Sequence, residues 1–447
     1  MNENTGLSPE VRGLYHVVSY GCQMNAHESE KIAGLLEKAG YVPTCEPAEA
    51  DVLVLNTCCV RDSAEQRIIG HIGTLKKYKQ RRPDMKIAVV GCLTQRRDAA
   101  ERLARTFPFV DIILGTQDLS ALSTALERMD PVRDWQETKH LNDAVDERDR
   151  LPAVRAEGPS AQINIMYGCD NFCTYCIVPH VRGPERSRGA AAVLEEAWQL
   201  EQAGYREVQL LGQNVNSYCS EVDFCGLLER LLAETAIDRI RFMTSHPKDL
   251  SDRLIELISR EKRLCSHIHL PLQSGSDAVL RRMNRRYTAA QYLDLADRIR
   301  SAVPDITLTT DLIVGFPGET DADFAETLAM VEKVRFASAY TFVYSPRRGT
   351  PAAAMPNQVS KETKKRRIMK LIDLQQAVTH ELNRERIGRT EQVLVTGLAA
   401  RGTGDMTGRS DGGRTVNFPG PESMTGRIVP VRITDAKSST LYGQLEV

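Results

Sequence analysis

The sequence predicts an α/β protein in three parts: an amino-terminal open parallel α/β domain, a central partial (β/α)6 barrel and a small carboxyl-terminal β-barrel. Strand-like and helix-like segments alternate over residues 14–115 and again over 162–345. Such alternation is typical of right-handed βαβ units that build parallel sheets. After residue 390, short β-rich pieces are separated by glycine-rich turns such as SDGGR, which indicates a small β-barrel.

Composition narrows the class of protein. The chain has 447 residues, 42% of them hydrophobic, which is enough for two or three domains with cores of their own. The formal net charge of −1 provides no global basic field, so any RNA binding must come from local patches. The 11 cysteines are an odd, scattered set, unlike those of small secreted domains. With a polar start and no long apolar run, we expect a cytoplasmic protein with reduced thiols.

The first series of elements places three cysteines alike. We expect strands at 14–19, 51–56, 86–90 and 110–114, with helices such as 28–38 and 63–78 between them. Cys22, Cys58 and Cys92 each stand one to three residues past the end of a strand. Parallel strands bring such positions to one carboxyl edge, where open α/β folds bind ligands. A lone buried cysteine is more often a small core residue, but three at the same topological position favour metal ligation.

Residues 131–161 are charged and lack apolar periodicity, so we interpret them as a linker or an irregular crossing segment. Six strands follow in the second series, which is fewer than the eight of a closed barrel. Active residues in such a fold lie on the loops after the strands. The expected strands are 163–166, 207–211, 239–244, 267–270, 307–314 and 339–344.

A tight cysteine cluster, Cys169-x3-Cys173-x2-Cys176, follows the first of these strands. A [4Fe–4S] cluster normally takes four thiolates. Three thiolates leave one iron open, as a catalytic metal site keeps a position for its substrate. His180 makes a Cys3His zinc site the alternative at this spacing.

Basic residues outside the cysteine motifs have two interpretations. Residues 358–389 look helical and include the run Lys364 to Arg367, which is either a solvated face or a nucleic-acid contact. The same alternatives, phosphate contact or solvated surface, apply to a second set of arginines. These are Arg182, Arg186, Arg188, Arg347 and Arg348.

The run GCDNFCTYC resembles the signature of the radical S-adenosylmethionine (SAM) superfamily, and Tyr175 matches an aromatic residue often found there. The resemblance implies that Cys169, Cys173 and Cys176 hold a catalytic [4Fe–4S] cluster. The open iron of that cluster binds SAM, which is cleaved to a 5′-deoxyadenosyl radical. Such a radical requires an enclosed, dry site.

Further motifs resemble the radical SAM methylthiotransferases, from about residue 12 to the end. They are GCQMN, NTCCVR, GCLTQ, LLGQNVNSY, HLPLQSGS, TDLIVGFPGET and YSPRRGTPAA. The resemblance implies a second, auxiliary [4Fe–4S] cluster on Cys22, Cys58 and Cys92. Cys59 departs from the commoner residue of the family, and strand position and motif favour Cys58 as the ligand. The implied domains are 12–130 (methylthiotransferase amino-terminal domain), 131–154 (linker), 155–382 (radical SAM core) and 383–447 (TRAM domain).

The motif GCQMN, together with the segment GCDNFCTYCIVPHVRGPERSR, is most similar to the MiaB-type branch of this family. That branch converts N6-isopentenyladenosine at position 37 of tRNA, next to the anticodon, to its 2-methylthio derivative. One SAM donates a methyl group to a sulfide on the auxiliary cluster, and a second SAM yields the radical. The RimO branch, which modifies a protein side chain, typically has proline and lysine where Gln23 and Met24 stand here.

Three alternatives remain open: a RimO-like protein substrate, threonylcarbamoyladenosine in tRNA, and a cluster or zinc protein that serves electron transfer or RNA binding without catalysis. The expected partners are tRNA bearing isopentenyladenosine, an electron donor such as a flavodoxin or ferredoxin, and a sulfur donor. We expect a monomer that does not bind membranes. Polar residues at the ends of the barrel strands are either loop and cap residues or SAM contacts alongside Tyr175. They are Gln213 and Asn214 after the second strand, Gln273 and Ser274 after the fourth, and Asp311, which begins the stretch that closes the fifth.

Overall fold

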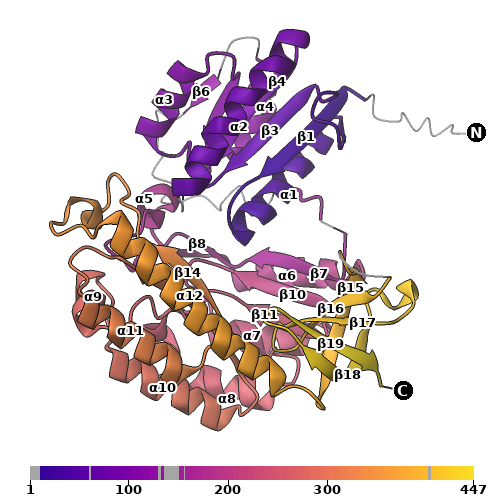
Figure 1. Ribbon diagram of the computed structural model, residues 1–447. Helices are drawn as coiled ribbons and strands as arrows, with labels where there is room; N and C mark the ends of the chain where they lie inside the picture. The colour runs from indigo at the N-terminus through magenta and orange to yellow at the C-terminus, as the bar shows by residue number, and fades with distance from the viewer. Residues whose placement is uncertain are drawn as a thin grey trace, which may run out of the picture. The chain divides into compact units, whose positions relative to one another are not determined.

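The computed structural model describes residues 11–59, 62–128, 132–134, 149, 151–155, 157–400 and 404–446. The chain forms two compact units (Figure 1). Unit 1 comprises Met1–Ala156 and Ile177–Pro184, and unit 2 comprises Glu157–Cys176 and Glu185–Val447. The chain therefore enters unit 2, returns to unit 1 for a short segment, and then completes unit 2.

Unit 1 contains an entirely parallel sheet of six strands in the order β2-β1-β3-β4-β5-β6. All six residues of β3 are buried, as expected for a parallel strand covered on both faces. The four predicted strands are confirmed, while β2 and β6 are additional edge strands; β6 lies within the segment for which no regular structure was predicted. The strands are β1 (Gly13–Ser19), β2 (Tyr41–Pro43), β3 (Val52–Thr57), β4 (Lys86–Gly91), β5 (Ile112–Gly115) and β6 (Val132–Asp134).

Helices cover both faces of this sheet and give unit 1 two cores. One core joins the sheet to α1 (Gln23–Lys38) and α4 (Leu122–Leu126). The other joins it to α2 (Asp62–Arg81) and α3 (Arg97–Thr106). The short helix α5 (Val178–Arg182) also belongs to unit 1, because Ile177 and Val181 are buried in the second core. No pattern in the sequence predicted that this short segment would interrupt the radical SAM core.

Unit 2 begins with a partial barrel of six parallel strands. They form two three-stranded sheets, β7-β10-β11 and β12-β13-β14. Backbone hydrogen bonds from Ser245 to His269 and from Cys265 to Ile240 join the two sheets. The six predicted strands are thus confirmed, with ends shifted by a few residues. They are β7 (Ser160–Asn164), β10 (Glu207–Leu211), β11 (Arg239–Phe242), β12 (His267–His269), β13 (Thr307–Val314) and β14 (Ser338–Val343).

Helices between these strands bury a single large core against the sheets. Their starts are encoded locally. Thr288 with Gln291 and Thr320 with Asp323 form capping boxes at two of them, which satisfy backbone N–H groups that have no partner within the helix. The helices are α6 (Ala190–Gln202), α7 (Phe224–Glu234), α8 (Asp252–Arg260), α9 (Asp277–Arg282), α10 (Ala289–Ala302) and α11 (Asp321–Val334).

The chain then follows the long helix α12 (Lys361–Arg384) into a closed five-stranded barrel with the order β15-β16-β17-β19-β18. This confirms the small β-barrel predicted from the glycine-rich turns. No helix of the described chain combines the length and apolarity needed to cross a lipid bilayer. The strands are β15 (Thr390–Leu398), β16 (Met406–Ser410), β17 (Thr415–Phe418), β18 (Ile428–Ala436) and β19 (Thr440–Leu445).

The small barrel packs on the amino-terminal ends of the β10–β13 strands. Arg239, the first residue of β11, donates to the carbonyl oxygens of Gln392 and Arg409 at 2.6 and 3.0 Å. The turn between β16 and β17 adds a hydrogen bond from the Ser266 N–H to Asp411 at 2.8 Å. Since ligands bind at the carboxyl ends of such strands, this barrel occupies the opposite end from the catalytic loops.

Candidate active site and metal centres

Cys22, Cys58 and Cys92 follow β1, β3 and β4 and lie at the carboxyl edge of the unit 1 sheet, as the sequence predicted. The strand order reverses between β1 and β3, since β2 lies outside β1 and β4 outside β3. Ligands bind at such a switch point in open α/β sheets. Cys22 and Cys58 lie on its two sides. The fold therefore provides a binding position where the sequence supplies thiols.

Close backbone approach brings the first two of these cysteines together. Gly21 has φ +114°, and a side-chain Cβ at this position would lie 2.7 Å from Cys58 Sγ. Cys58 and Cys92 are buried, whereas Cys22 is exposed. Soft thiolates in a partly open site suit an iron–sulfur cluster. The ligand roles of the three cysteines stay predictions.

Cys59 contacts Cys92. A hydrogen bond from Cys59 lowers the pKa of the Cys92 thiol, and the Arg182 charge lowers it further, against the opposing effect of burial. Cys59 is fully buried and belongs to the core between the sheet and helices α2 and α3. We therefore retain Cys58 as the candidate ligand and assign Cys59 to the packing beside it.

In unit 2, Cys169, Cys173 and Cys176 lie on the loop after β8 (Met166–Tyr167), which pairs with β9 (Arg186–Ser187) as an antiparallel ribbon. Several hydrogen bonds hold this loop. Thr174 donates from its N–H to the Met283 carbonyl at 3.1 Å and from its hydroxyl to the Arg282 carbonyl at 2.8 Å. The three sulfurs are thus presented on a loop fixed by the segment after α9.

Arg285 comes from this same segment and donates to Cys173 Sγ at 3.4 Å and to the Pro271 carbonyl at 2.8 Å. Its side chain is buried, and its Nε donates to the Tyr287 hydroxyl at 3.0 Å. A buried guanidinium that donates to a cysteine sulfur holds that side chain in place, as supporting contacts do around metal ligands. Sequence reasoning missed Arg285, because its approach to Cys173 spans 112 residues.

The two metal alternatives differ in geometry. A mononuclear zinc site needs four ligands around one ion. Within the described ranges, no three His, Cys, Asp or Glu side chains are arranged around one ion position. The thiolates of a [4Fe–4S] cluster each bind a different iron, so they do not need to converge on a point. The all-sulfur donor set on each sheet edge fits such a cluster.

Of the predicted SAM contacts, Tyr175 packs edge-to-face on Phe316, with ring centroids 6.4 Å apart. Asn214 is buried, and its amide is engaged at both ends. Its Nδ2 donates to Asp249 at 2.7 Å, and its Oδ1 accepts from the His246 N–H at 3.0 Å. Asn214 therefore orders the loop after β10, beside Gln213.

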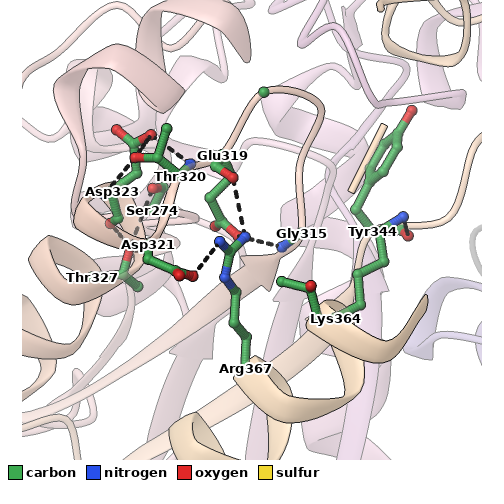
Figure 2. Close-up of polar contacts among 12 residues, drawn as sticks. Ser274, Gly315, Glu319, Thr320, Asp321, Asp323, Thr327, Tyr344, Lys364 and Arg367 are labelled. Carbon is green, nitrogen blue, oxygen red and sulfur yellow. Dashed lines mark hydrogen bonds and ion pairs between the residues drawn. The ribbon is translucent and has the colours of Figure 1, made fainter. Parts of the chain in front are cut away.

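Gln273 and Ser274 lie after β12, as predicted. Gln273 has φ +69° and bridges to β13 through backbone hydrogen bonds with Asp311 and Ile313. Ser274 is fully buried, and its hydroxyl lies 3.3 Å from that of Thr327 (Figure 2). Its side chain therefore organises the loop rather than pointing to solvent.

Asp311 lies within β13 and is not on the following loop. Its carboxylate lies 3.4 Å from His269 Nε2 on the neighbouring strand. His269 in turn packs edge-to-face on Tyr340 of β14, a ring that is 53% exposed. A polar row across three adjacent barrel strands thus accompanies Asp311. The register of the three strands creates this row, with Asp311 paired to Tyr340 and His269 paired to Thr309, and strand alternation alone does not predict that register.

Two predictions about basic residues are corrected. Arg182 and Arg188 are not solvated and do not offer free charge to phosphates, because both are buried and bonded to carboxylates, Glu28 and Glu196. Lys364 and Arg367 of α12 point inward, while Lys365 and Arg366 between them are exposed. Helical periodicity separates the run into two faces. Arg347 is also buried, whereas Arg348 is exposed.

Comparisons with known proteins agree with this architecture. Family models described as the Radical SAM superfamily, Uncharacterized protein family UPF0004 and the TRAM domain match residues 163–331, 14–115 and 384–445. Among solved structures, the radical S-adenosylmethionine methyltransferase TsrM from Kitasatospora setae matches with TM-score 0.54 at 15% identity, over 77% of each chain. At that identity the match concerns the fold alone.

Curated relatives extend the similarity along the chain. The tRNA-2-methylthio-N(6)-dimethylallyladenosine synthase of Pelotomaculum thermopropionicum is 47% identical over 437 residues, covering 96% of this chain and 97% of that protein. The protein of the same name from Carboxydothermus hydrogenoformans is 46% identical over 440 residues, covering 96% and 99%. The superfamily match implies SAM and one [4Fe–4S] cluster as cofactors. The chain therefore belongs to the family of tRNA-2-methylthio-N(6)-dimethylallyladenosine synthases.

Proposed function

We propose that this protein methylthiolates C2 of N6-isopentenyladenosine at position 37 of tRNA. The observation that carries the proposal is the similarity of about 46% over nearly the whole chain to curated synthases of that name. The fold supports it, because Cys22, Cys58 and Cys92 lie at the carboxyl edge of a parallel sheet, where such folds bind ligands. The other trio lies on the loop after β8, beyond the carboxyl end of the parallel strand β7. The C2–H bond of adenine lacks useful acidity, so a radical route suits it better than a general base.

We assign one [4Fe–4S] cluster to Cys169, Cys173 and Cys176, and a second to Cys22, Cys58 and Cys92. When bound, the first would supply the electron that cleaves SAM and the second would present the sulfur for transfer. The residues of the protein do the rest. Arg285 donates a hydrogen bond to Cys173 Sγ, while Asn214, Gln273 and Ser274 hold the loops after β10 and β12. Tyr175, Gln213 and Asp311 remain our candidates for SAM contacts.

The proposed partners are tRNA, an electron donor of the flavodoxin or ferredoxin kind, and a sulfur donor, with the enzyme acting as a cytoplasmic monomer. The exposed residues Lys365, Arg366 and Arg348 are the candidates for phosphate contacts. We retain the domain boundaries 12–130, 131–154, 155–382 and 383–447 as part of this proposal. The return of Ile177–Pro184 to unit 1 is a local exception to them.

The test is anaerobic reconstitution with iron and sulfide, followed by reductant, SAM and tRNA bearing isopentenyladenosine. Mass spectrometry of the digested nucleosides should show the 2-methylthio product. Cys173→Ala should abolish 5′-deoxyadenosine, whereas Cys58→Ala should retain it and lose only the methylthio product. Cys59→Ala is the matched comparison. It removes the hydrogen bond to Cys92 but no predicted ligand, so it should keep 5′-deoxyadenosine and more of the methylthio product than Cys58→Ala.

The outcomes separate the alternatives. A 2-methylthio group on threonylcarbamoyladenosine, or a methylthio group on a protein side chain, with unmodified isopentenyladenosine would contradict the proposed substrate. Absence of 5′-deoxyadenosine from the reduced, iron-loaded protein would contradict radical chemistry altogether. Equal loss of the methylthio product in Cys59→Ala and Cys58→Ala would contradict the assignment of Cys58 alone.

A further inference from the structure

Arg182 is a buried arginine in the wall of the Cys22, Cys58 and Cys92 site. It is the last residue of α5, and its side chain is 4% exposed. Ile177 and Val181 anchor α5 in the core of unit 1. The segment directly after Cys176 thus contributes an arginine to the sheet edge that carries the other cysteine trio.

The contacts of Arg182 fix its guanidinium at this edge. Its Nη1 and Nη2 donate to the two carboxylate oxygens of Glu28 at 2.7 and 3.2 Å, a two-pronged pair of the strong kind. Nη2 also donates to Asn25 Oδ1 at 3.1 Å. Asn25 is tied to β3 through a 2.8 Å hydrogen bond to the Thr57 carbonyl. The same Asn25 oxygen accepts from Cys22 Sγ at 3.5 Å.

The positive charge of Arg182 therefore interacts both with the carboxylate of Glu28 and with the sulfurs of the nearby cysteines. Burial of charges without partners is costly, and three buried or half-open thiolates add negative charge to a site that already contains Glu28. The positive charge of Arg182 also acts on Cys92, where it contributes to lowering the pKa of the thiol. The potential of an iron–sulfur cluster depends on net charge and on hydrogen bonds to its sulfurs, and such supporting contacts tune metal sites generally.

We propose that Arg182 is a positioning residue whose positive charge, balanced by Glu28, sets the reduction potential and retention of the cluster on Cys22, Cys58 and Cys92. The inference rests on the second cluster of the proposed function and deepens it. Adding an electron to a cluster adds negative charge. A nearby cation therefore raises the potential, and a nearby carboxylate lowers it.

The experiment isolates the second site. The three cysteines Cys169, Cys173 and Cys176 are all replaced by alanine in the full chain, which is then reconstituted with iron and sulfide. Iron content and the midpoint potential are measured by redox titration with electron paramagnetic resonance. Arg182→Met should lower the potential and the iron content, while Glu28→Gln should raise the potential. Arg182→Lys keeps the positive charge, so its potential should stay close to that of the protein with Arg182.

Arg97→Met is the matched control, because this arginine is also in unit 1 but 73% exposed, and it should leave the potential unchanged. If Arg182 had only a structural role, Arg182→Met and Glu28→Gln would shift the midpoint potential in the same direction or leave it unchanged. Either result would overturn the proposal. If Arg182→Met does not fold, the directions in which Glu28→Gln and Arg182→Lys change the midpoint potential test the proposal instead. Failure of the three-alanine protein to bind any iron would instead overturn the second cluster itself, and the inference with it.

Discussion

Arg367 of α12 forms a buried ion pair with Glu319 on the loop after β13. The Nη1 atom of Arg367 lies 2.7 Å from Glu319 Oε2, and the two side chains are 4% and 1% exposed. The same Glu319 oxygen accepts from the Gly315 N–H at 2.7 Å, and Arg367 Nη2 reaches Asp321 at 2.7 Å (Figure 2). One arginine thus connects the helix that leads to the small barrel with a loop at the catalytic end of the large one.

Replacing Arg367 with methionine should destabilise unit 2 by about 3–5 kcal/mol, because Glu319 would remain buried without its partner. Loosening of the loop should also weaken SAM binding. Chemical unfolding and SAM titration calorimetry measure the two effects. Arg366→Met is the control, since that side chain is 67% exposed and its loss should change stability by no more than about 0.5 kcal/mol. Equal effects of both substitutions would contradict the role of the buried pair.

Arg285→Met should reduce both iron binding at Cys169, Cys173 and Cys176 and SAM cleavage by about 10-fold to 100-fold, the usual range for contacts that support metal ligands. The variant loses the donor to Cys173 Sγ and one of the two donors to the Pro271 carbonyl, which keeps its hydrogen bond from the Tyr287 hydroxyl. Iron analysis and the yield of 5′-deoxyadenosine are the measurements. Arg286→Met changes the exposed neighbour and should behave as the unmodified protein. Full iron loading and SAM cleavage in Arg285→Met would sink this role.

Arg239→Ala should loosen the small barrel without affecting unit 1. Two carbonyl groups of the small barrel, those of Gln392 and Arg409, would lose the hydrogen bonds from Arg239, at about 0.5–1.5 kcal/mol for each hydrogen bond. Hydrogen exchange should rise in the strands β15 and β16 while protection of β3 and β4 is unchanged. Arg432→Ala, at a 60% exposed position of β18, serves as control. Uniform exchange changes in both variants would count against the specific attachment.

His246 should make stability depend on pH. Burial, with the nearby charge of Arg285, lowers its pKa from 6.5 to about 2. Below pH 6.5 His246 therefore binds a proton in the unfolded chain but stays neutral in the folded protein. The contribution of neutral His246 to the free energy of unfolding is therefore fully present above pH 6.5. It decreases by about 1.4 kcal/mol for each pH unit of acidification below that value. Between pH 7 and 5, His246→Gln should therefore lose less thermal stability than the unmodified protein; parallel curves would refute the assignment.

Much of the fold followed from the sequence because its signals are local. The strands of both sheets are apolar runs between amphipathic helices, and Cys22, Cys58 and Cys92 could be placed at one edge by topology alone. The edge strands β2 and β6 are three residues long, too short for a periodicity to register. The strands β2 and β6 form because they pair with a neighbouring strand, and not because their own sequences have a strand-like pattern.

The contacts of the sites were less predictable, because they join residues far apart in the chain. The Arg182–Glu28 pair spans 154 positions, and the Arg285–Cys173 contact spans 112. A basic run such as Lys364 to Arg367 indicates charge but not direction, and only the core against which α12 packs determines which side chains face inward. Composition therefore suggested phosphate contacts where the structure has buried ion pairs.

Gly21→Ala should disable the second site while sparing the first. The backbone at Gly21 has φ +114°, and a methyl group there would press on Cys58, with its carbon 2.7 Å from the sulfur. Such an approach forces Cys58 or the turn after β1 to move. Iron bound by the three-alanine protein described above should fall sharply, whereas 5′-deoxyadenosine formation by the otherwise unmodified enzyme should persist. Gly204→Ala separates backbone strain from contact, because Gly204 has φ +90° with nothing within 4 Å of its Cβ position. Equal iron loss in the two variants would point to a general loss of stability and would contradict a specific effect of the contact with Cys58.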